Sequence, residues 1–412
     1  MLGFLQRGYR MTILFITLLD IRNIDEHNIY ADLMRELAKN GNDVFVVSPV
    51  ERRFKEQPRM IEYNESDDWH KNVHILKVKT GNIQKTNIIE KGITTVLIES
   101  KITKAIKNHF KKVKFDLVTY STPPITIVKP ISFIKRRDNA KTYLMLKDIF
   151  PQNAVDLGML KKTGLKGLLY KFFRNKEKKL YAISDKIGCM SQANVDYVLN
   201  HNPEISEEKV EIFPNCIEPI DVSLTDEEKI AMRNKYGIPT NRRVFVYGGN
   251  LGRPQGVSFI IDCLRAEKDN DKVFFLIVGD GTEYGKLEQF EKEEHPSNFK
   301  LMKRLPKDDY DRMIASCDVG MIFLDHRFTI PNFPSRLLSY MQAGIPVLAC
   351  TDPNTDIGKV IVDGGFGWWC ESDDIDNFTS IISESAIPYC DEKIRNLLKE
   401  HYSVAGEIER WN

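Results

Sequence analysis

The sequence predicts an α/β protein with two doubly wound domains. Strand-like apolar runs alternate with helix-like segments along almost the whole chain, which is typical of parallel sheets with helices on both faces. This alternation is interrupted once, at residues 219–241, where Pro219, an acidic run at 226–228 and Gly237 stand close together. The length of 412 residues also favours two domains over one.

The first domain is expected to span residues 1–218. Its apolar runs are nearly continuous, as in strands that are buried on both faces, and apolar residues recur at helical spacing between them. We expect strands at 13–19, 43–48, 73–78, 115–120, 142–146, 186–190 and 210–213, and helices at 28–39, 94–110 and 165–182.

The second domain is expected to span residues 242–385, after a linker at 219–241. The alternation predicts strands at 244–247, 273–278, 299–301, 319–323 and 346–349, and helices at 257–264, 283–294, 308–316, 334–343 and 375–385. Residues 386–412 are expected to form a helical tail that packs near the domain junction. Because ligands of doubly wound sheets bind at the carboxyl ends of the strands, motifs at these ends are the candidates for function.

The composition argues against several classes of protein. The formal net charge of +1 gives no reason to expect nucleic acid as a partner. The seven cysteines form no CxxC pair, which favours reduced thiols in the cytoplasm over disulfides or a zinc site. The apolar run after Met11 is short and ends at Asp20, and no run reaches 18 apolar residues. We therefore expect neither a signal peptide nor a membrane span.

The stretch 244–256 is the most informative motif. A β-branched and aromatic run breaks into four glycines around Arg253, and a helix-like segment follows. Glycines let backbone amides approach a ligand, and a helix N-terminus presents free N–H groups and a positive dipole end. An arginine matches phosphate oxygens in a bidentate way. We therefore predict a phosphate-binding loop here, against the alternative of a tight turn without a ligand.

Further motifs follow at other strand ends. Asp280 lies in a glycine turn, and Lys303 and Arg304 follow another strand; each of these is equally compatible with a plain solvated turn. The run 364–369 is predicted to be a glycine and aromatic turn that closes a pocket or packs against one.

A second anion site is predicted at the start of the helix expected at 334–343. Pro334 suits the first turn of a helix, and Ser335 or Asn332 can cap it. Its N-terminal amides would then face an anion.

As a set, the motifs at 148–152, 213–218, 248–256, 278–281 and 334–347 resemble those of bacterial glycosyltransferases of the GT-B fold, in the large retaining family 4. The branch that they resemble is the capsule, O-antigen and colanic-acid type, which includes N-acetyl-fucosamine transferases. The resemblance implies two Rossmann-like domains that face a central cleft, the first for the acceptor and the second for a nucleotide-sugar donor. It also implies retention of anomeric configuration and no cofactor.

The resemblance assigns the donor-binding residues by their motif positions, and we expect a UDP-sugar rather than a GDP-sugar. The assigned residues are Gly248, Gly249, Asn250, Gly252, Gln255, Gly256, Asp280, Lys303, Arg304, Pro334, Ser335, Arg336, Leu337, Ser339 and Tyr340.

The chain departs from the family pattern on the donor side. Two glutamates of the family would fall at Pro331 and Ser339, and the lysine of its donor loop would fall near Gln255. We therefore expect Arg253 to carry more of the phosphate charge. Ser339, Tyr340 or nearby backbone amides would take the roles of the glutamates.

The acceptor side also departs from the pattern. The family's Gly-Gly loop is replaced by residues 21–27, in which Asn23 and His27 are the acceptor-binding candidates. His326 is a further histidine candidate. Asp148 follows a predicted buried strand and either orients or deprotonates an acceptor hydroxyl, or serves as a structural cap.

Catalysis by such an enzyme means stabilising the negative charge of the departing diphosphate. Arg253, the amides of 249–252 and the helix start at 334–336 would supply the hydrogen-bond donors. The acidic pairs at 308–309 and 373–374 are interpreted as helix caps rather than metal ligands. A reaction without a metal is therefore expected.

The segment 160–181 combines lysines with interleaved apolar residues. It is either a surface that contacts an anionic membrane, from Lys161 to Lys179, or a partly buried helix with a solvated lysine face. Contact with the inner face of the cytoplasmic membrane would suit a polyprenyl-linked acceptor; an oligosaccharide acceptor is the other expectation.

We therefore predict a glycosyltransferase that moves a hexose, N-acetylated or deoxy, onto a glycan or lipid-linked acceptor of a bacterial surface polysaccharide. Three alternatives were weighed. A nucleotide-sugar 2-epimerase of the same fold would need an acidic, histidine-lined sugar pocket, and a two-domain solute-binding protein would need export. A nicotinamide dehydrogenase would need a G-x-G-x-x-G loop, which the chain lacks.

Overall fold

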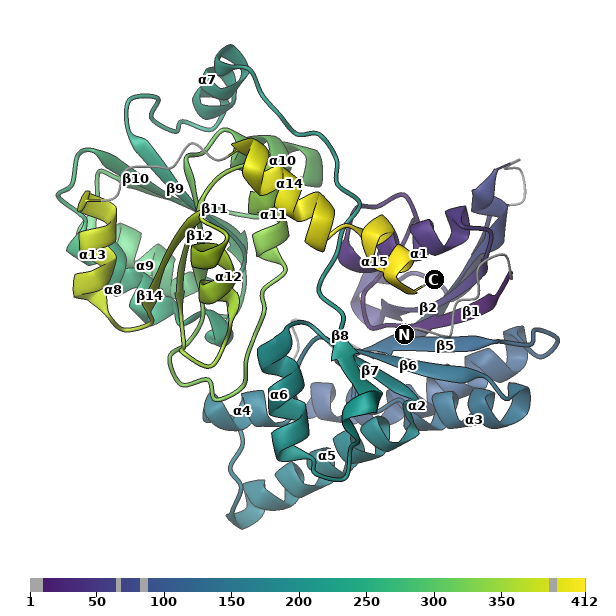
Figure 1. The fold of residues 1–412 in the computed structure, drawn as a ribbon. Coiled ribbons are helices and arrows are strands. Elements are labelled where there is room, and N and C mark those ends of the chain that lie inside the picture. Colours follow the sequence, from purple (N-terminus) through teal and green to yellow (C-terminus); the bar gives the residue numbers. More distant parts are fainter. Residues whose placement is uncertain (1–9, 64–67, 82–87, 385–390, 412) are drawn as a thin grey trace. The chain divides into compact units, whose positions relative to one another are not determined.

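The computed structural model describes residues 10–63, 68–81, 88–384 and 391–411 (Figure 1). The chain divides after Glu218 into two compact units, and the residues from Val404 onward return to the first unit. Each unit is an α/β body with its own sheet. Both predicted sheets are therefore present, and the α/β class is confirmed.

The first unit contains an eight-stranded sheet in the order β3-β4-β2-β1-β5-β6-β7-β8, in which only the β3–β4 pair is antiparallel. Its strands are β1 (Thr12–Ile16), β2 (Asp43–Glu51), β3 (Arg59–Glu62), β4 (Val73–Thr80), β5 (Leu117–Ser121), β6 (Lys141–Leu146), β7 (Lys186–Cys189) and β8 (Val210–Ile212). Its helices are α1 (Ile29–Lys39), α2 (Ile88–His109), α3 (Val128–Asp138), α4 (Gln152–Asp156), α5 (Gly164–Ile183), α6 (Gln192–His201) and α15 (Val404–Trp411).

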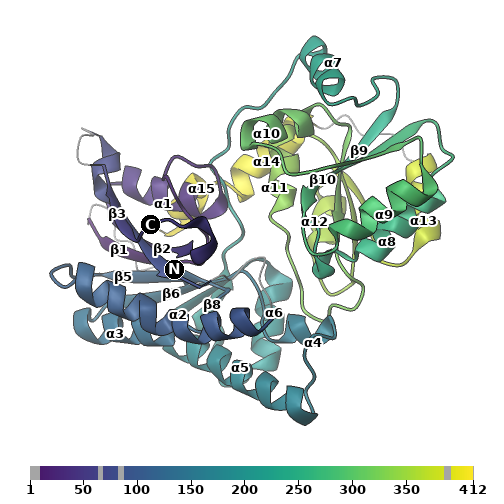
Figure 2. The same cartoon turned by 180° about the vertical axis from the view of Figure 1, so that it is seen from behind.

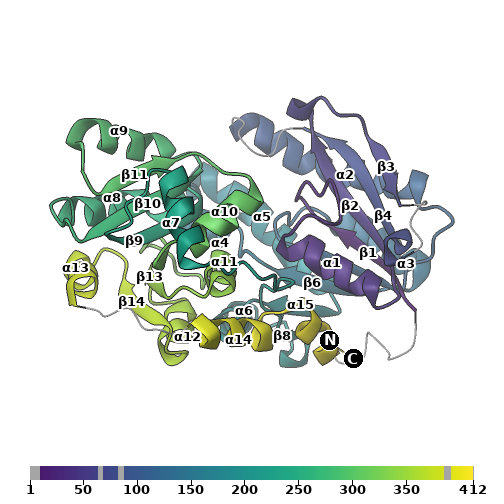
Figure 3. The ribbon, with the colours of Figure 1, turned by 90° about the horizontal axis from the view of Figure 1, so that it is seen from above.

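Helices cover both faces of this sheet. α2, α3 and α5 form one layer, and α1 and α15 lie beside each other on the other face (Figures 1 and 3). Asn28 caps α1, because its side chain accepts hydrogen bonds from the amides of Tyr30 and Ala31. Buried apolar side chains of β1, β2, α1 and α15 form the core beneath that helix pair.

The second unit contains a six-stranded parallel sheet in the order β11-β10-β9-β12-β13-β14. Its strands are β9 (Arg243–Asn250), β10 (Val273–Asp280), β11 (Phe299–Met302), β12 (Val319–Phe323), β13 (Val347–Thr351) and β14 (Gly367–Glu371). Its helices are α7 (Asp226–Lys235), α8 (Val257–Ala266), α9 (Tyr284–Glu294), α10 (Lys307–Ala315), α11 (Arg336–Ala343), α12 (Ile357–Asp363), α13 (Ile375–Glu384) and α14 (Asp391–His401). α8, α9 and α13 lie together, and α10 and α11 lie with α14 (Figure 2).

The elements β3, α3, α4, α6 and α12 lie where the sequence predicted none, and three further regions differ from the expectations. Residues 367–371 form β14, an edge strand, although the glycine and aromatic composition of this run predicted a turn. The stretch expected as a linker belongs to the second unit and contains α7, which begins with a capping box between Thr225 and Glu228. The C-terminal tail is divided, because α14 belongs to the second unit and α15 to the first.

Candidate functional site

The glycine loop lies where β9 ends and α8 begins. The short 3₁₀ turn η4 (Arg253–Gln255) fills it, and Gly256 completes it with a φ of 57°. The Oε1 atom of Gln255 accepts hydrogen bonds from the Gly252 amide at 3.0 Å and from Asn250 Nδ2 at 3.3 Å. The side chain of Gln255 thus holds the loop in shape from within.

The neighbouring strand supports the loop. Asp280 at the end of β10 is in register with Asn250, and its carbonyl accepts a hydrogen bond from the Leu251 amide at 3.0 Å. On the other side, the Pro254 carbonyl accepts one from the Asp325 amide at 2.9 Å, just after β12. The loop is therefore tied to both strands that flank β9.

Two of the loop glycines are required for different reasons. A Cβ atom on Gly248 would lie 2.0 Å from the Tyr310 hydroxyl, so packing against α10 excludes a side chain there. Gly249 has a φ of 130°, and a Cβ atom on it would lie 3.6 Å from the Arg336 guanidinium. Gly249 is thus the point at which the loop backbone approaches a cation.

Arg336 is the first residue of α11 and lies over the ring of Tyr247, with its guanidinium carbon 4.2 Å from the ring centroid. Its Nη1 atom is shielded from solvent and has no hydrogen-bond partner among the residues that the structure describes. Within the described ranges Arg336 also takes part in no ion pair. A shielded cation without an anion is costly, which makes this guanidinium a candidate to bind an anionic ligand.

The chain that leads into α11 carries a second shielded donor. The Nδ2 atom of Asn332 is excluded from solvent and lacks a partner. The amides of Leu337 and Leu338 donate to the carbonyls of Pro334 and Ser335, and the side chain of Ser335 makes no capping hydrogen bond. The predicted caps, Ser335 and Asn332, are thus not used as caps in this structure.

Other residues of this helix differ in exposure. Leu337 and Tyr340 are fully buried. The Tyr340 hydroxyl accepts from the Gly248 amide at 3.2 Å and lies 2.9 Å from the Met321 carbonyl, which accepts from it. Tyr340 therefore positions the end of β9 and is not placed to take a glutamate's role toward a ligand. Ser339 is only partly buried and makes no side-chain hydrogen bond among the described residues.

The other cations predicted from sequence are more exposed than Arg336. The side chain of Arg253 is 56% exposed, and its Nε atom lies 3.8 Å from Glu283 Oε1. Lys303 follows the edge strand β11, and its ammonium lies 3.2 Å from the ring centroid of Tyr284. Arg304 is exposed. Of these three, Arg253 alone belongs to the glycine loop.

Sequence reasoning missed Asp352, which follows β13 at the same edge of the sheet. Its carboxyl is buried, and burial raises its pKa to about 6. Oδ1 accepts a hydrogen bond from the Asn354 amide at 3.0 Å, whereas Oδ2 has no partner. A lone aspartate after a strand carries no signal in the sequence; its burial became visible only in the fold.

In the first unit, Asp148 lies just beyond β6. Burial raises the pKa of its carboxyl to about 6, against the effect of Asn153, whose Nδ2 atom donates to both carboxylate oxygens at 2.8 Å. The chain next to it, at Ile149 and Gln152, lines a cavity of about 210 Å³. The remaining lining residues come mainly from α5 and α6 and include Arg174, Tyr181 and Tyr197.

The acceptor candidates lie in the turn after β1. Asn23 accepts a hydrogen bond from the Tyr63 hydroxyl at 2.8 Å. His27 Nδ1 lies 3.2 Å from Arg35 Nη2 and 3.5 Å from Asp32. His326, in the second unit, instead lies 2.7 Å from the Asp373 carboxylate. Both histidines are thus engaged with charged neighbours.

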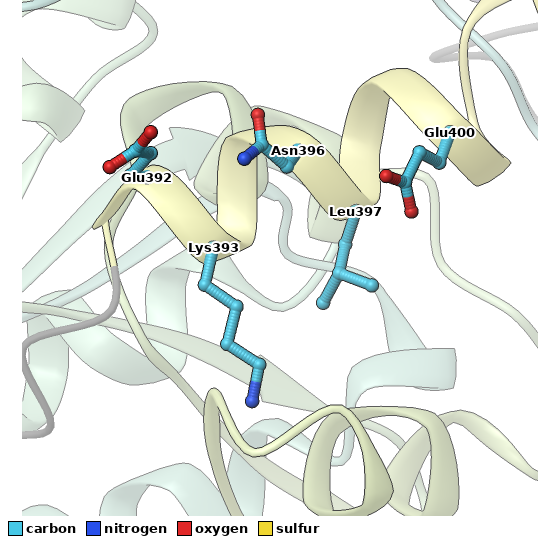
Figure 4. Close-up of a pocket in the computed structure, with 5 residues that line it drawn as sticks. All are labelled: Glu392, Lys393, Asn396, Leu397 and Glu400. Carbon is cyan, nitrogen blue, oxygen red and sulfur yellow. The ribbon is translucent and has the colours of Figure 1, made fainter.

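Figure 4 shows a shallow pocket along α14, lined by Glu392, Lys393, Asn396, Leu397 and Glu400. None of the predicted site residues lines it. In the part of the chain that the structure describes, no group of three or more histidine, cysteine or acidic side chains could hold a metal ion. No helix there is both long enough and apolar enough to cross a membrane.

Comparison with known proteins identifies the second unit. Residues 228–385 match the family model described as "Glycosyl transferases group 1", and this range includes the glycine loop and α11. The chain is 24% identical to the probable glycosyltransferase WbjE of Pseudomonas aeruginosa over 341 residues, which cover 79% of this chain and 80% of that protein. This chain is a glycosyltransferase with the GT-B fold.

A further curated relative agrees with this assignment, and solved structures agree with the fold. A putative colanic acid biosynthesis glycosyltransferase, WcaI of Escherichia coli, is 22% identical over 60% of each chain. The structure of Anabaena HepE in complex with UDP matches 97% of this chain and 98% of its own chain, with a TM-score of 0.65 and 14% identity. Sucrose-phosphate synthase of Thermosynechococcus elongatus matches 97% of each chain, with a TM-score of 0.73 and 13% identity. The predicted GT-B fold is thereby confirmed.

Proposed function

We propose that this glycosyltransferase moves a hexose, N-acetylated or deoxy, from a UDP-sugar to a glycan or lipid-linked acceptor of a bacterial surface polysaccharide. The relatives support the pathway, since WcaI is described as a colanic acid enzyme and TuaC of Bacillus subtilis as a teichuronic acid enzyme. Anabaena HepE, a structural neighbour, is described in complex with UDP and with UDP-glucose. These descriptions favour a UDP-sugar donor here.

The observation that carries the proposal is the shielded, unpaired guanidinium of Arg336 against Gly249. A diphosphate at this strand end would meet the Arg336 guanidinium and the shielded side-chain amide of Asn332. Arg253 would approach from the loop itself. No described carboxylate pairs with Arg336. We therefore propose Arg336, rather than Arg253, as the principal phosphate ligand.

In the reaction, the bond between the anomeric carbon and the diphosphate oxygen breaks, and its electron pair moves onto the diphosphate. The acceptor hydroxyl oxygen forms the new bond to that carbon and loses its proton. Fixed cations and amides stabilise the charge on the leaving group without reorganising. Retention at the anomeric carbon and independence of metal belong to the proposal through the family resemblance.

Asp148 is the proposed group for the acceptor side. Its pKa of about 6 keeps the carboxyl mostly ionised at neutral pH and near the range in which it can exchange a proton. Asn153 fixes its orientation through both oxygens. Asn23 and His27 remain the proposed contacts to the rest of the acceptor, which is polyprenyl-linked or an oligosaccharide.

The proposal also includes catalysis at the cytoplasmic face of the membrane, with contact through the segment from Lys161 to Lys179.

The test of the transfer reaction is incubation of the purified chain with UDP-sugars, GDP-sugars and NAD. Thermal stabilisation and slow donor hydrolysis with a UDP-sugar are expected. Stabilisation by NAD but not by UDP or GDP would overturn the assignment of the loop, and release of a free 2-epimer would replace transfer by epimerisation.

A further inference from the structure

Helix α5 and the segment just before it carry an unusual concentration of exposed apolar side chains. Of the ten large apolar side chains exposed in the described part of the chain, five lie between Met159 and Phe172. Leu165 is 87% exposed and Leu168 is 65% exposed. Single exposed leucines are ordinary, but a cluster of this size marks a surface that binds something.

The cluster occupies one stripe of the helix. Leu165, Leu168, Leu169 and Phe172 follow the spacing i, i+3, i+4, i+7, which places them on one face. The opposite face holds the buried residues Glu177 and Tyr181. Figures 1 and 2 show that the N-terminal turns of α5 project beyond the neighbouring helices of its layer.

The charges around the stripe are almost all positive. Between Met159 and Ile183 the sequence has seven lysines and Arg174, but its one carboxylate is Glu177. Glu177 is buried, where it accepts hydrogen bonds from Arg174 at 2.6 Å and from the Tyr181 hydroxyl at 2.8 Å. The exposed surface of this segment therefore carries no negative charge.

The lysines nearest to the stripe are not neutralised. Lys161, Lys162, Lys166 and Lys171 are exposed and take part in no ion pair among the described residues. Farther along the helix, Lys176 lies 3.4 Å from Glu99, and Lys178 lies 3.0 Å from Glu204. Lys166 and Lys171 thus flank the stripe on the helix, and Lys161 and Lys162 precede it, with the Lys162 ammonium 5.8 Å from the ring centroid of Tyr170. The paired lysines, Lys176 and Lys178, lie beyond the stripe.

We propose that the stripe, with Met159, inserts into the headgroup region of a bilayer rich in anionic phospholipids, while Lys161, Lys166 and Lys171 contact the lipid phosphates. Apolar side chains flanked by lysines match the apolar interior and negative surface of such a bilayer. Nucleic acid would match the lysines but not the leucines. This inference specifies which side chains make the membrane contact of the proposed function. It rests on that proposal for the location of the acceptor at the membrane.

The test is co-sedimentation of the full chain with phosphatidylcholine vesicles that contain or lack phosphatidylglycerol. Binding is expected to the anionic vesicles alone and to weaken in high salt. The double variant Leu165→Ser/Leu168→Ser should bind roughly tenfold or more weakly, since two exposed apolar groups no longer enter the bilayer. Lys166→Gln/Lys171→Gln should weaken binding by roughly fivefold for each lysine removed.

Matched controls come from exposed residues elsewhere. Ile230→Ser/Val362→Ser removes two exposed apolar side chains of the second unit, and Lys268→Gln/Lys272→Gln removes two exposed lysines there; both should bind as the unaltered chain does. Equal loss in the control variants, or no binding to anionic vesicles, would overturn the inference. A dimer in solution that Leu165→Ser/Leu168→Ser dissociates would also overturn it, by making the stripe an interface between copies.

Hydrolysis of the UDP-sugar without vesicles separates this inference from the proposed function. It should be unchanged in all four double variants, because none alters a proposed donor or acceptor residue. Hydrolysis without vesicle binding would refute the membrane surface alone. Vesicle binding without any turnover of nucleotide sugars would refute the proposed function alone.

Discussion

The two units differ in whether the cation near the carboxyl end of a central strand is paired with a carboxylate. After β1, the buried ammonium of Lys77 is paired with Asp20 and donates to the Ile21 carbonyl at 2.9 Å. After β9, the described residues place no carboxylate in an ion pair with the shielded guanidinium of Arg336 and leave one of its nitrogens without a hydrogen-bond partner. Both sheets thus place a cation near the carboxyl end of a central strand. Among the described residues, the cation after β1 is neutralised and the cation after β9 is not. We infer from this difference that the strand end of the second unit is the anion site.

The same contrast extends to Arg35 in the first unit. Its guanidinium lies 2.6 Å from Asp32 and 2.7 Å from Glu218, so its charge is also satisfied within the fold. We infer that the cations around β1 serve stability and that the cation at β9 serves binding.

The largest effect is expected for Arg336→Gln. Loss of a donor aimed at the developing charge should lower kcat/KM for the UDP-sugar by roughly a hundredfold or more. The melting temperature should stay the same or rise, because the change removes a shielded, unpaired charge. Steady-state kinetics and thermal unfolding measure the two effects. The matched control is Arg265→Gln, which removes an exposed arginine already paired with Asp262 and Glu294.

Asp148→Asn should lower kcat/KM by roughly a hundredfold if this carboxylate assists the acceptor hydroxyl. The unaltered enzyme should lose activity as the pH falls through about 6, the pKa of Asp148, and the variant should lack this limb. If the variant loses activity over the same pH range, the titrating group is another residue.

Unfolding separates this role from a structural one. Because the pKa of Asp148 is raised in the folded state, its contribution to stability is present below its ordinary pKa and is lost as the pH rises through about 6. Asp148→Asn should therefore unfold at a higher temperature than the unaltered chain at pH 8. A lower melting temperature there would make Asp148 a structural residue.

A smaller kinetic effect is expected for Arg253→Ala. Its side chain is mostly exposed, so a phosphate contact from it is weakened by solvent. We expect kcat/KM to fall by roughly tenfold, the value of one modest charge-assisted hydrogen bond. An effect larger than that of Arg336→Gln would return the principal role to the loop.

The smallest effect on catalysis is expected for Lys77→Met, which belongs to the neutralised side. It leaves Asp20 without its buried partner and should lower the free energy of unfolding by about 2 kcal/mol, since Asp20 is partly solvated. The affinity for UDP should not change. Recovery of stability in Asp20→Asn/Lys77→Met, measured by urea unfolding, is the matching control.

Much of the fold followed from the sequence because buried parallel strands are continuous apolar runs. The runs at β1, β9 and β10 are of this kind, and the glycine loop follows directly from β9. β14 escaped prediction because its two tryptophans follow glycines, a composition typical of turns. The sequence did not predict α7, because the prolines and acidic residues around it resemble those of a linker.

The site was predicted less completely, because burial and pairing depend on residues far apart in the chain. The sequence places Arg253 and Arg336 in motifs but does not show which guanidinium is shielded. Likewise, Gly248 resembles a ligand-binding glycine, whereas packing against Tyr310 already requires it. Tyr340 resembles a ligand contact at its motif position, but its hydroxyl is used by the strand ends.

The most direct test of the central claim is calorimetric titration of UDP into the unaltered chain, Arg336→Gln and Arg265→Gln. We predict that Arg336→Gln weakens binding by about 2 kcal/mol, roughly thirtyfold, because a charge-assisted contact to the diphosphate is lost. Arg265→Gln should bind UDP as tightly as the unaltered chain. Equal affinity in all three proteins would contradict the claim that the unneutralised cation after β9 is the diphosphate site.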